Sequence, residues 1–189
     1  MDFTVTFERT NRVTYDFDGD QFKAFDDSEE EPVPILGEIF ADDEKMGELV
    51  LYGLHNDTDF FDQCDALHGD FAVIAAAICG KSGAVLKKYV PDISQYESIY
   101  ILDNITINKE YRGHGIGSAI VKNLLKMITY QFGDASVLFL CASDFESAKE
   151  YGFDSREYKA GTQRLIKFYS KLGFRVIKDN IMVYHQTRN

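Results

Sequence analysis

Apolar and polar residues alternate in two short runs near the start of the chain. The apolar positions are Phe3, Val5 and Phe7, and then Val13, Tyr15 and Phe17. Because the polar residues 10–12 separate the two runs, the pattern predicts a β-hairpin. The acidic run DDSEEE at residues 26–31 is expected to be an exposed connection. Residues 35–40 and 48–54 are expected to form two further strands.

From residue 57 the apolar positions recur at steps of three and four. They are Phe60, Phe61, Cys64, Leu67, Phe71, Ile74, Ala75 and Ile78. This spacing places them on one helical face. Asp57 or Thr58 could cap the first turn, and Gly80 suits the position after the last turn. Gly69 weakens the middle, so the segment forms either one helix or two shorter ones.

The second half of the chain alternates between strand and helix patterns. Residues 98–107 are rich in β-branched and aromatic residues and predict a central strand. Residues 116–128 and 161–172 predict helices, and the apolar run at 137–141 predicts a strand buried on both faces. A closing hairpin is expected around residues 179–180. This order predicts a layered α/β sheet, and 189 residues fit one domain.

Charge and composition exclude several classes of protein. The net charge of −11 argues against general nucleic-acid binding. Residues 1–70 carry 20 Asp and Glu against 4 Lys and Arg, whereas the remainder is basic. This asymmetry favours a cationic partner for one half and an anionic partner for the other, although acidic loops that aid solubility would give the same counts.

Neither a membrane protein nor a disulfide-rich secreted one is expected. The longest apolar run, at residues 72–79, is too short to span a membrane, and the first residues do not form a secretory signal. Three cysteines are too few for a disulfide framework, and the Cys and His spacing matches no metal motif. We therefore expect a reduced, cytoplasmic protein without a metal.

A glycine-rich segment at residues 105–118, ITINKEYRGHGIGS, joins the central strand to a helix. Glycines at Gly113, Gly115 and Gly117 allow successive N–H groups to face one anion, and the helix dipole adds positive charge. A tight turn would need the same residues. A P-loop is excluded because Ser118 and Ala119, not Lys and Ser or Thr, follow the last glycine. The spacing also excludes a dinucleotide-binding fingerprint.

The run Arg112-Gly113-His114-Gly115-Ile116-Gly117 resembles the acetyl-CoA signature R/Q-x-x-G-x-G/A of the GNAT acyltransferase superfamily. A second block, KFYSKLGF at residues 167–174, resembles the family's late segment. The resemblance covers about residues 98–185. It implies a central mixed, mostly antiparallel sheet flanked by helices, and acetyl-CoA as the acyl donor.

The resemblance also implies roles for individual residues. The cofactor-binding residues would be Ile105, Ile107, Arg112, Gly113, His114, Gly115, Ile116, Gly117 and Ser118. Tyr169 would donate a proton to the departing thiolate. Asp103 and Asn104 lie on the central strand, where some relatives have an acid or a water-holding group, and Asp103 is the candidate general base. Strand alternation places Asp103 on the side of Ile105, and Glu97 lies at the entrance of the strand. Packing alone would also account for Tyr169, and a local hydrogen bond for Asp103.

Three features depart from the family pattern. Thr162 stands where many relatives have Asn, and Leu165 where they have Ala. Residues 144–160 are an insertion that forms either a lid over the acceptor or a surface excursion.

We therefore expect an acetyl-CoA-dependent N-acetyltransferase that acts on a primary amine. A cationic small molecule or peptide amine is the expected acceptor, without nucleic acid or membrane as partner, and the chain could form a homodimer. The alternative is a CoA-binding sensor or interaction protein without transferase activity.

Overall fold

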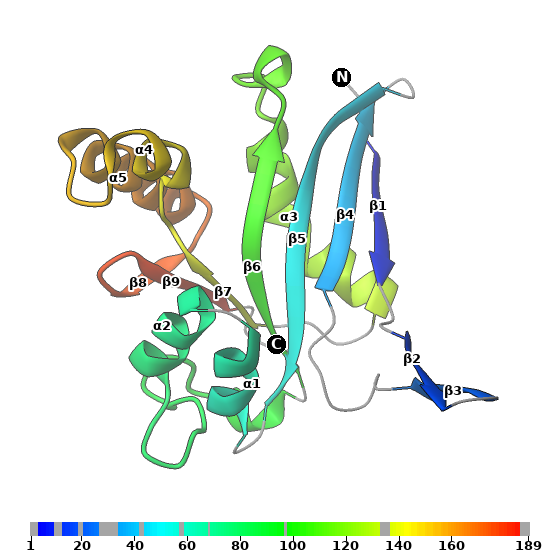
Figure 1. Cartoon of the computed structure of the whole chain (residues 1–189). Helices are drawn as coiled ribbons and strands as arrows, with labels where there is room; N and C mark the ends of the chain where they lie inside the picture. Colours follow the sequence, from blue (N-terminus) through cyan, green and yellow to red (C-terminus); the bar gives the residue numbers. More distant parts are fainter. Residues whose placement is uncertain are drawn as a thin grey trace.

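A computed structural model of the 189-residue chain describes residues 4–9, 13–18, 21–26, 34–41, 44–56, 59–67, 69–96, 98–132 and 137–185. Its main feature is a seven-stranded sheet (Figure 1). In spatial order the strands are β1 (Thr4–Arg9), β4 (Pro34–Ala41), β5 (Glu44–His55), β6 (Ser98–Ile107), β7 (Val137–Cys141), β9 (Ile181–His185) and β8 (Arg175–Lys178). Neighbouring strands are antiparallel except β6 and β7, which are parallel.

Helices cover both faces of the sheet. The helices α1 (Phe60–Leu67) and α2 (Gly69–Ile78) pack on one face, and α3 (Ile116–Phe132) and α5 (Arg156–Lys171) pack on the other. Strand β6 serves both cores, since Ile99 and Ile101 face α2 whereas Tyr100 and Leu102 face α3. The expected mixed, mostly antiparallel sheet flanked by helices is therefore confirmed. Gly69 does separate two helices, as one of the two interpretations predicted.

The prediction that the first two apolar runs of the chain pair as a hairpin is wrong. Strand β1 pairs instead with β4, where Val5 lies opposite Ile39. Strand β2 (Val13–Asp18) pairs with β3 (Gln21–Asp26), which the sequence pattern did not indicate. Val5 and Phe7 pack against the core on the α3 face. Burial against this distant core decides the partner of β1, and the short-range alternation does not show it. The turn at residues 10–12, the acidic residues 27–31 and the caps Asp57 and Thr58 lie outside the described residues.

The parallel strands β6 and β7 separate after a short contact. They pair only between Tyr100–Leu102 and Leu138–Leu140. Strand β6 then continues to Ile107, whereas the chain leaves β7 at Cys141 and enters α4 (Phe145–Tyr151). A gap between two strands exposes unpaired main-chain groups, which a ligand can use. No helix in the described part of the chain is long and apolar enough to span a membrane.

Candidate functional site

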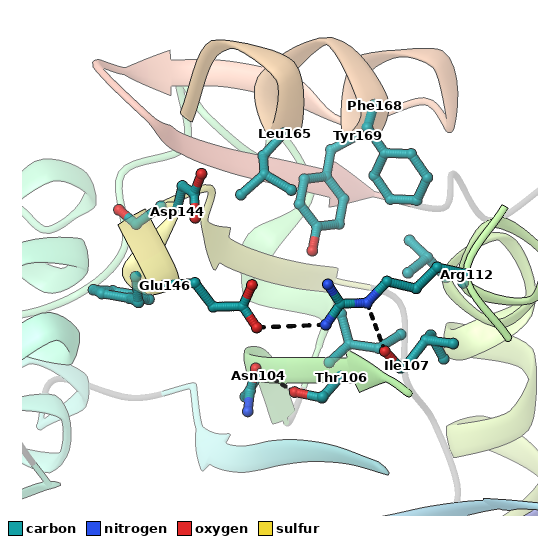
Figure 2. Close-up of a pocket in the computed structure, with 14 residues that line it drawn as sticks. Asn104, Thr106, Ile107, Arg112, Asp144, Glu146, Leu165, Phe168 and Tyr169 are labelled. Atoms are coloured by element: carbon teal, nitrogen blue, oxygen red, sulfur yellow. Dashed lines mark hydrogen bonds and ion pairs between the residues drawn. The ribbon is translucent and has the colours of Figure 1, made fainter. Parts of the chain in front are cut away.

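A cavity of about 420 Å³ lies where β6 and β7 separate (Figure 2). Its wall is formed by β6, the start of α3, the chain after β7, and α5. The lining residues are Asn104, Ile105, Thr106, Ile107, Arg112, Gly117, Val121, Ser143, Asp144, Phe145, Glu146, Leu165, Phe168 and Tyr169. Small-molecule sites usually enclose about 300–1,000 Å³, so the cavity is large enough for an extended ligand.

The glycine-rich loop lies at the α3 end of this cavity. Gly113 and Gly115 have φ angles of 85° and 81°, which side chains rarely adopt, and Gly117 lines the cavity itself. Among the described residues, no acceptor takes a hydrogen bond from the main-chain N–H groups of residues 113–118. The first turn of a helix leaves such donors free, and its dipole favours a negative charge there. The loop is therefore suited to bind an anion.

Arg112 crosses the cavity from the loop. Its Nε donates a hydrogen bond of 2.8 Å to the main-chain oxygen of Ile107. Its Nη2 forms an ion pair of 3.4 Å with Oε1 of Glu146 on α4. Figure 2 shows both interactions, with the guanidinium group between β6 and α4. Both side chains are largely exposed, so the ion pair is weak and a ligand can replace it.

Tyr169 reaches the cavity from α5. Its side chain is only 8% exposed, and Figure 2 shows its hydroxyl group pointing into the cavity. The rings of Phe168 and Phe174 hold it at centroid distances of 5.1 and 5.5 Å. Burial raises the pKa of Tyr169 to about 12, and no described residue forms a hydrogen bond with the hydroxyl group. At neutral pH this group is a proton donor available to a ligand.

Hydrogen bonds fix the chain that leaves β7. Asn180 Nδ2 donates to Ser143 Oγ at 2.6 Å, and Ser143 Oγ lies 3.3 Å from the Tyr158 hydroxyl. Asp144 accepts from the N–H of Ser147 at 3.1 Å and caps α4. The N–H of Asp144 donates to Thr162 Oγ1 at 3.3 Å, which gives Thr162 a structural role. The insertion at residues 144–160 is therefore α4 and the first turn of α5, and its first residues line the cavity.

Asp103 does not lie where strand alternation placed it. In the pairing of β5 with β6, Val50 lies opposite Asn104 and Leu51 opposite Leu102, so Asp103 is an extra residue in a β-bulge. The bulge shifts the alternation, so that Asp103 lies on the α2 side and Ile105 packs on the α3 side. The expectation that they share a side is wrong.

A second, much smaller pocket of about 10 Å³ lies on the α2 side. It is lined by Asp70, Phe71, Ile74, Ile101, Leu102, Asp103, Cys141 and Phe145.

The structure places five of the predicted site residues in the wall of the large cavity. They are Ile105, Ile107, Arg112, Gly117 and Tyr169. The other loop residues, which are Gly113, His114, Gly115, Ile116 and Ser118, lie next to it in the loop and the first turn of α3. Glu97 is outside the described residues.

The sequence indicates a lid or a surface excursion at residues 144–160, but it does not assign Asp144, Phe145 and Glu146 to this wall. The only signal for them is the spacing of Asp144 and Ser147, which is typical of a helix N-cap. Among the described residues, no group of three or more His, Cys, Asp or Glu side chains could hold a metal ion.

No protein-family model matches the chain, and no curated protein sequence is similar to it. Several solved structures are similar to it. A Tyr-to-Phe mutant of KacT is 15% identical, with 82% of this chain and 71% of that chain covered and a TM-score of 0.41. AtaT complexed with acetyl-methionyl-tRNAfMet is 16% identical, with 96% and 95% covered and a TM-score of 0.40. NAA60 of Arabidopsis thaliana in complex with a bisubstrate analogue is 11% identical, with 82% and 77% covered and a TM-score of 0.45.

GNAT-fold acetyltransferases are thus among the solved structures similar to this chain, as the motif at residues 112–117 predicts. The exclusion of nucleic acid as a partner stays a prediction.

Proposed function

We propose that the protein is an acetyl-CoA-dependent N-acetyltransferase that acts on a primary amine. The observation that carries the proposal is the cavity between β6 and β7, which combines two features. The loop at its α3 end has main-chain N–H groups without an acceptor among the described residues, and its wall presents the hydroxyl group of the largely buried Tyr169 side chain. An extended thioester that carries phosphates at one end fits this arrangement.

Different residues of the cavity are suited to bind different parts of acetyl-CoA. The N–H groups of residues 113–118 would bind the pyrophosphate, and Arg112 would turn from Glu146 to the phosphates. The main chain of Ile105 and Ile107 lies on the part of β6 that has left β7, so its polar groups would be available to the pantetheine amides once Arg112 releases the oxygen of Ile107. The acetyl group would then lie near the point where the strands separate.

The reaction needs one nucleophile and three proton transfers. The nitrogen lone pair of the neutral amine attacks the carbonyl carbon and a C–N bond forms. The nitrogen then loses a proton to solvent as the C–S bond breaks. The departing thiolate takes a proton from the Tyr169 hydroxyl, which regains one from solvent. The ammonium proton must leave before the attack, since an alkylamine with a pKa near 10.4 is mostly protonated at pH 7. Asp103 is the candidate acceptor of that proton.

We further propose that the acceptor is a cationic small molecule or peptide amine and that the protein works in the cytoplasm. The small number of cysteines supports the cytoplasm. The net charge of −11 and the excess of carboxylates in residues 1–70 support a cationic acceptor. Such a field raises the local concentration of cations and would repel a nucleic acid.

Two measurements test the proposed function. CoA should raise the melting temperature, because a ligand that binds only the native state stabilises it. Free thiol should be released from acetyl-CoA when suitable amines are present, and a panel of amines, peptides and an aminoacyl-tRNA would identify the acceptor. A thermal shift without thiol release would instead indicate a CoA-binding protein, and no shift would overturn the proposal.

A matched pair of variants isolates the loop. Gly115→Val should abolish the thermal shift, since Gly115 has a φ of 81° and a side chain there distorts the loop. Gly83→Val introduces the same strain at a φ of 79° in a turn that does not line the cavity, and should bind CoA as the wild type does. Equal loss of binding in both variants would show that the loop has no specific role in binding CoA.

A further inference from the structure

The separation of β6 and β7 opens toward both faces of the sheet, and one residue lies at the boundary. Phe145 lines the 420 Å³ cavity and also the small pocket on the α2 face. We infer that the amine reaches the acetyl group from the α2 face past Phe145, and that Asp70, Asp103 and Phe145 select an unbranched cationic amine. This inference rests on the proposed function and names the residues that determine its acceptor.

The carboxylates of Asp70 and Asp103 lie at the small pocket, which is the proposed entrance on the α2 face. Each has a structural reason for its position. Asp103 faces α2 because of the β-bulge, and Asp70 lies in the first turn of α2. Both are exposed and line the small pocket. Their charges reach the neighbouring side chains. Burial raises the pKa of Tyr52, and the charge of Asp103 adds to the shift. Burial likewise raises the pKa of the Cys141 thiol, with a further contribution from Asp70.

The size of the entrance explains the selection against branched amines. The small pocket has about 10 Å³, which is close to the space of a single water molecule. The ring of Phe145 lies beside that of Phe153 at a centroid distance of 6.5 Å, and Phe153 lies 5.3 Å from the ring of Tyr158. Tyr158 lies within hydrogen-bond distance of Ser143, at the end of β7. An aromatic ring at a narrow opening admits a slender chain more readily than a branched one.

An independent observation indicates a ligand inside the opening. The Tyr169 side chain is more than nine-tenths buried, and its hydroxyl group points into the large cavity and forms no hydrogen bond with any described residue. This hydroxyl group can therefore exchange a hydrogen bond with a molecule bound in the cavity. Acetyl-CoA bound on the α3 side and the amine that enters from the α2 side would meet between Tyr169 and Phe145.

Two synthetic probes separate binding of the amine from the reaction. In one, the sulfur of CoA is joined through an acetyl spacer to 1,4-diaminobutane, which leaves one ammonium group. In the other the tail is n-pentylamine, which is similar in length and neutral. The wild-type protein should bind the ammonium probe more tightly in calorimetry. Asp70→Asn and Asp103→Asn should each reduce the ratio of the two affinities by about two- to fivefold, as expected for exposed charge pairs. CoA itself should bind both variants as before.

The matched control is Asp65→Asn on α1, which removes one exposed carboxylate that does not line either cavity. Its affinity ratio should equal that of the wild type. Failure of the wild type to bind CoA would overturn the proposed function and this inference with it. Binding of CoA without any preference for the ammonium probe, or with a preference that survives in both Asp variants, would overturn this inference alone.

The role of Phe145 has a separate test. Phe145→Ala should raise kcat/KM for an α-branched amine relative to that for its linear isomer. Tyr130→Ala removes a 92% exposed ring outside both cavities and should leave that ratio unchanged. Phe145→Leu keeps an apolar side chain and should give an intermediate ratio if the alanine variant does not fold. An unchanged ratio in the folded variants would overturn the selection by Phe145.

Discussion

Tyr169 shows how burial prepares a single residue for catalysis. The apolar surroundings that raise its pKa to about 12 also keep its hydroxyl group protonated. Tyr169→Phe should lower kcat about 10²–10⁴-fold with little change in the KM for acetyl-CoA, because a proton donor acts mainly in the transition state. Steady-state kinetics with the best amine would measure this change.

The same pKa fixes the pH dependence. A tyrosine that ionises near pH 12 remains a donor at lower pH, so the wild-type kcat should show no loss from Tyr169 between pH 7 and 10. Folding stability follows the same shift. The native state holds the proton up to about pH 12 and the unfolded chain only to about 10, so this contribution to stability is complete below pH 10 and disappears as the pH rises toward 12. If the chemical step limits the rate and Tyr169→Phe leaves kcat unchanged, Tyr169 has only a packing role.

Glu146 lines the cavity beside Arg112, which is an expected contact of the phosphates. Its carboxylate pairs with Arg112 at 3.4 Å and would repel an anionic ligand once Arg112 turns away. Glu146→Gln should therefore increase the affinity for CoA about two- to fivefold in calorimetry. Glu150→Gln makes the same charge change on the same helix outside the cavity and should have no effect. Weaker binding in the Glu146 variant would mean that the ion pair supports the site.

Single residues differ in how well the sequence predicts them. The positive φ angles of Gly113 and Gly115 follow from glycines between a strand and a helix, which local chemistry explains. The position of Asp103 does not follow from local chemistry. The bulge arises from the register of β6 against Leu51 and Val50, some fifty residues earlier in the chain. Alternation within one strand contains no information on that register.

At the scale of elements, α4 depends on its contact with α5. The carboxylate of Asp144 caps α4 and lies directly against Gly161 on α5, where a methyl group would collide with it. Gly→Ala within a helix normally stabilises by about 0.5–1 kcal/mol. Gly161→Ala should instead destabilise the protein by about 1–3 kcal/mol, as overpacking does, and should weaken CoA binding by shifting Phe145 and Glu146.

Chemical unfolding and calorimetry would measure these two effects. Gly69→Ala is the control, since Gly69 is also helical and a methyl group there has open space. It should be neutral or stabilising. A stabilising Gly161→Ala would show that Asp144 can move without consequence.

Elements with strong apolar patterns were predicted with their correct bounds. Strands β6 and β7 have the predicted bounds because dense β-branched and apolar residues define them. Helix α4 was missed, since seven residues of mixed charge have little intrinsic helicity and form a helix through the Asp144 cap and packing on α5. Helix α5 likewise begins five residues before the predicted start, at the cap of Ser155. Tertiary contacts therefore determine the structure of segments whose local helix propensity is weak.

On the scale of the whole molecule, the two halves of the sequence share their cores. Strand β6 pairs with β5 along its full length, from Ser98 opposite His55 to Ile107 opposite Gly47, but with β7 over only three residues. The core on the α3 face joins Leu49 and Leu51 to helix α3, and the core on the α2 face joins Phe71 to Phe139 of β7. The segment that carries the acetyl-CoA motif therefore depends on the first half of the chain.

This dependence predicts one cooperative unit. The full chain should unfold in a single transition, with coincident curves for helical circular dichroism and for the near-ultraviolet tyrosine signal. A fragment of residues 98–189 should not fold or bind CoA by itself, because it would expose the edge of β6 and lose the partners of Tyr100 and Leu102. Adding a fragment of residues 1–97 should restore both properties. Two separate transitions, or a folded 98–189 fragment that binds CoA, would show that the cofactor-binding half is an independent domain.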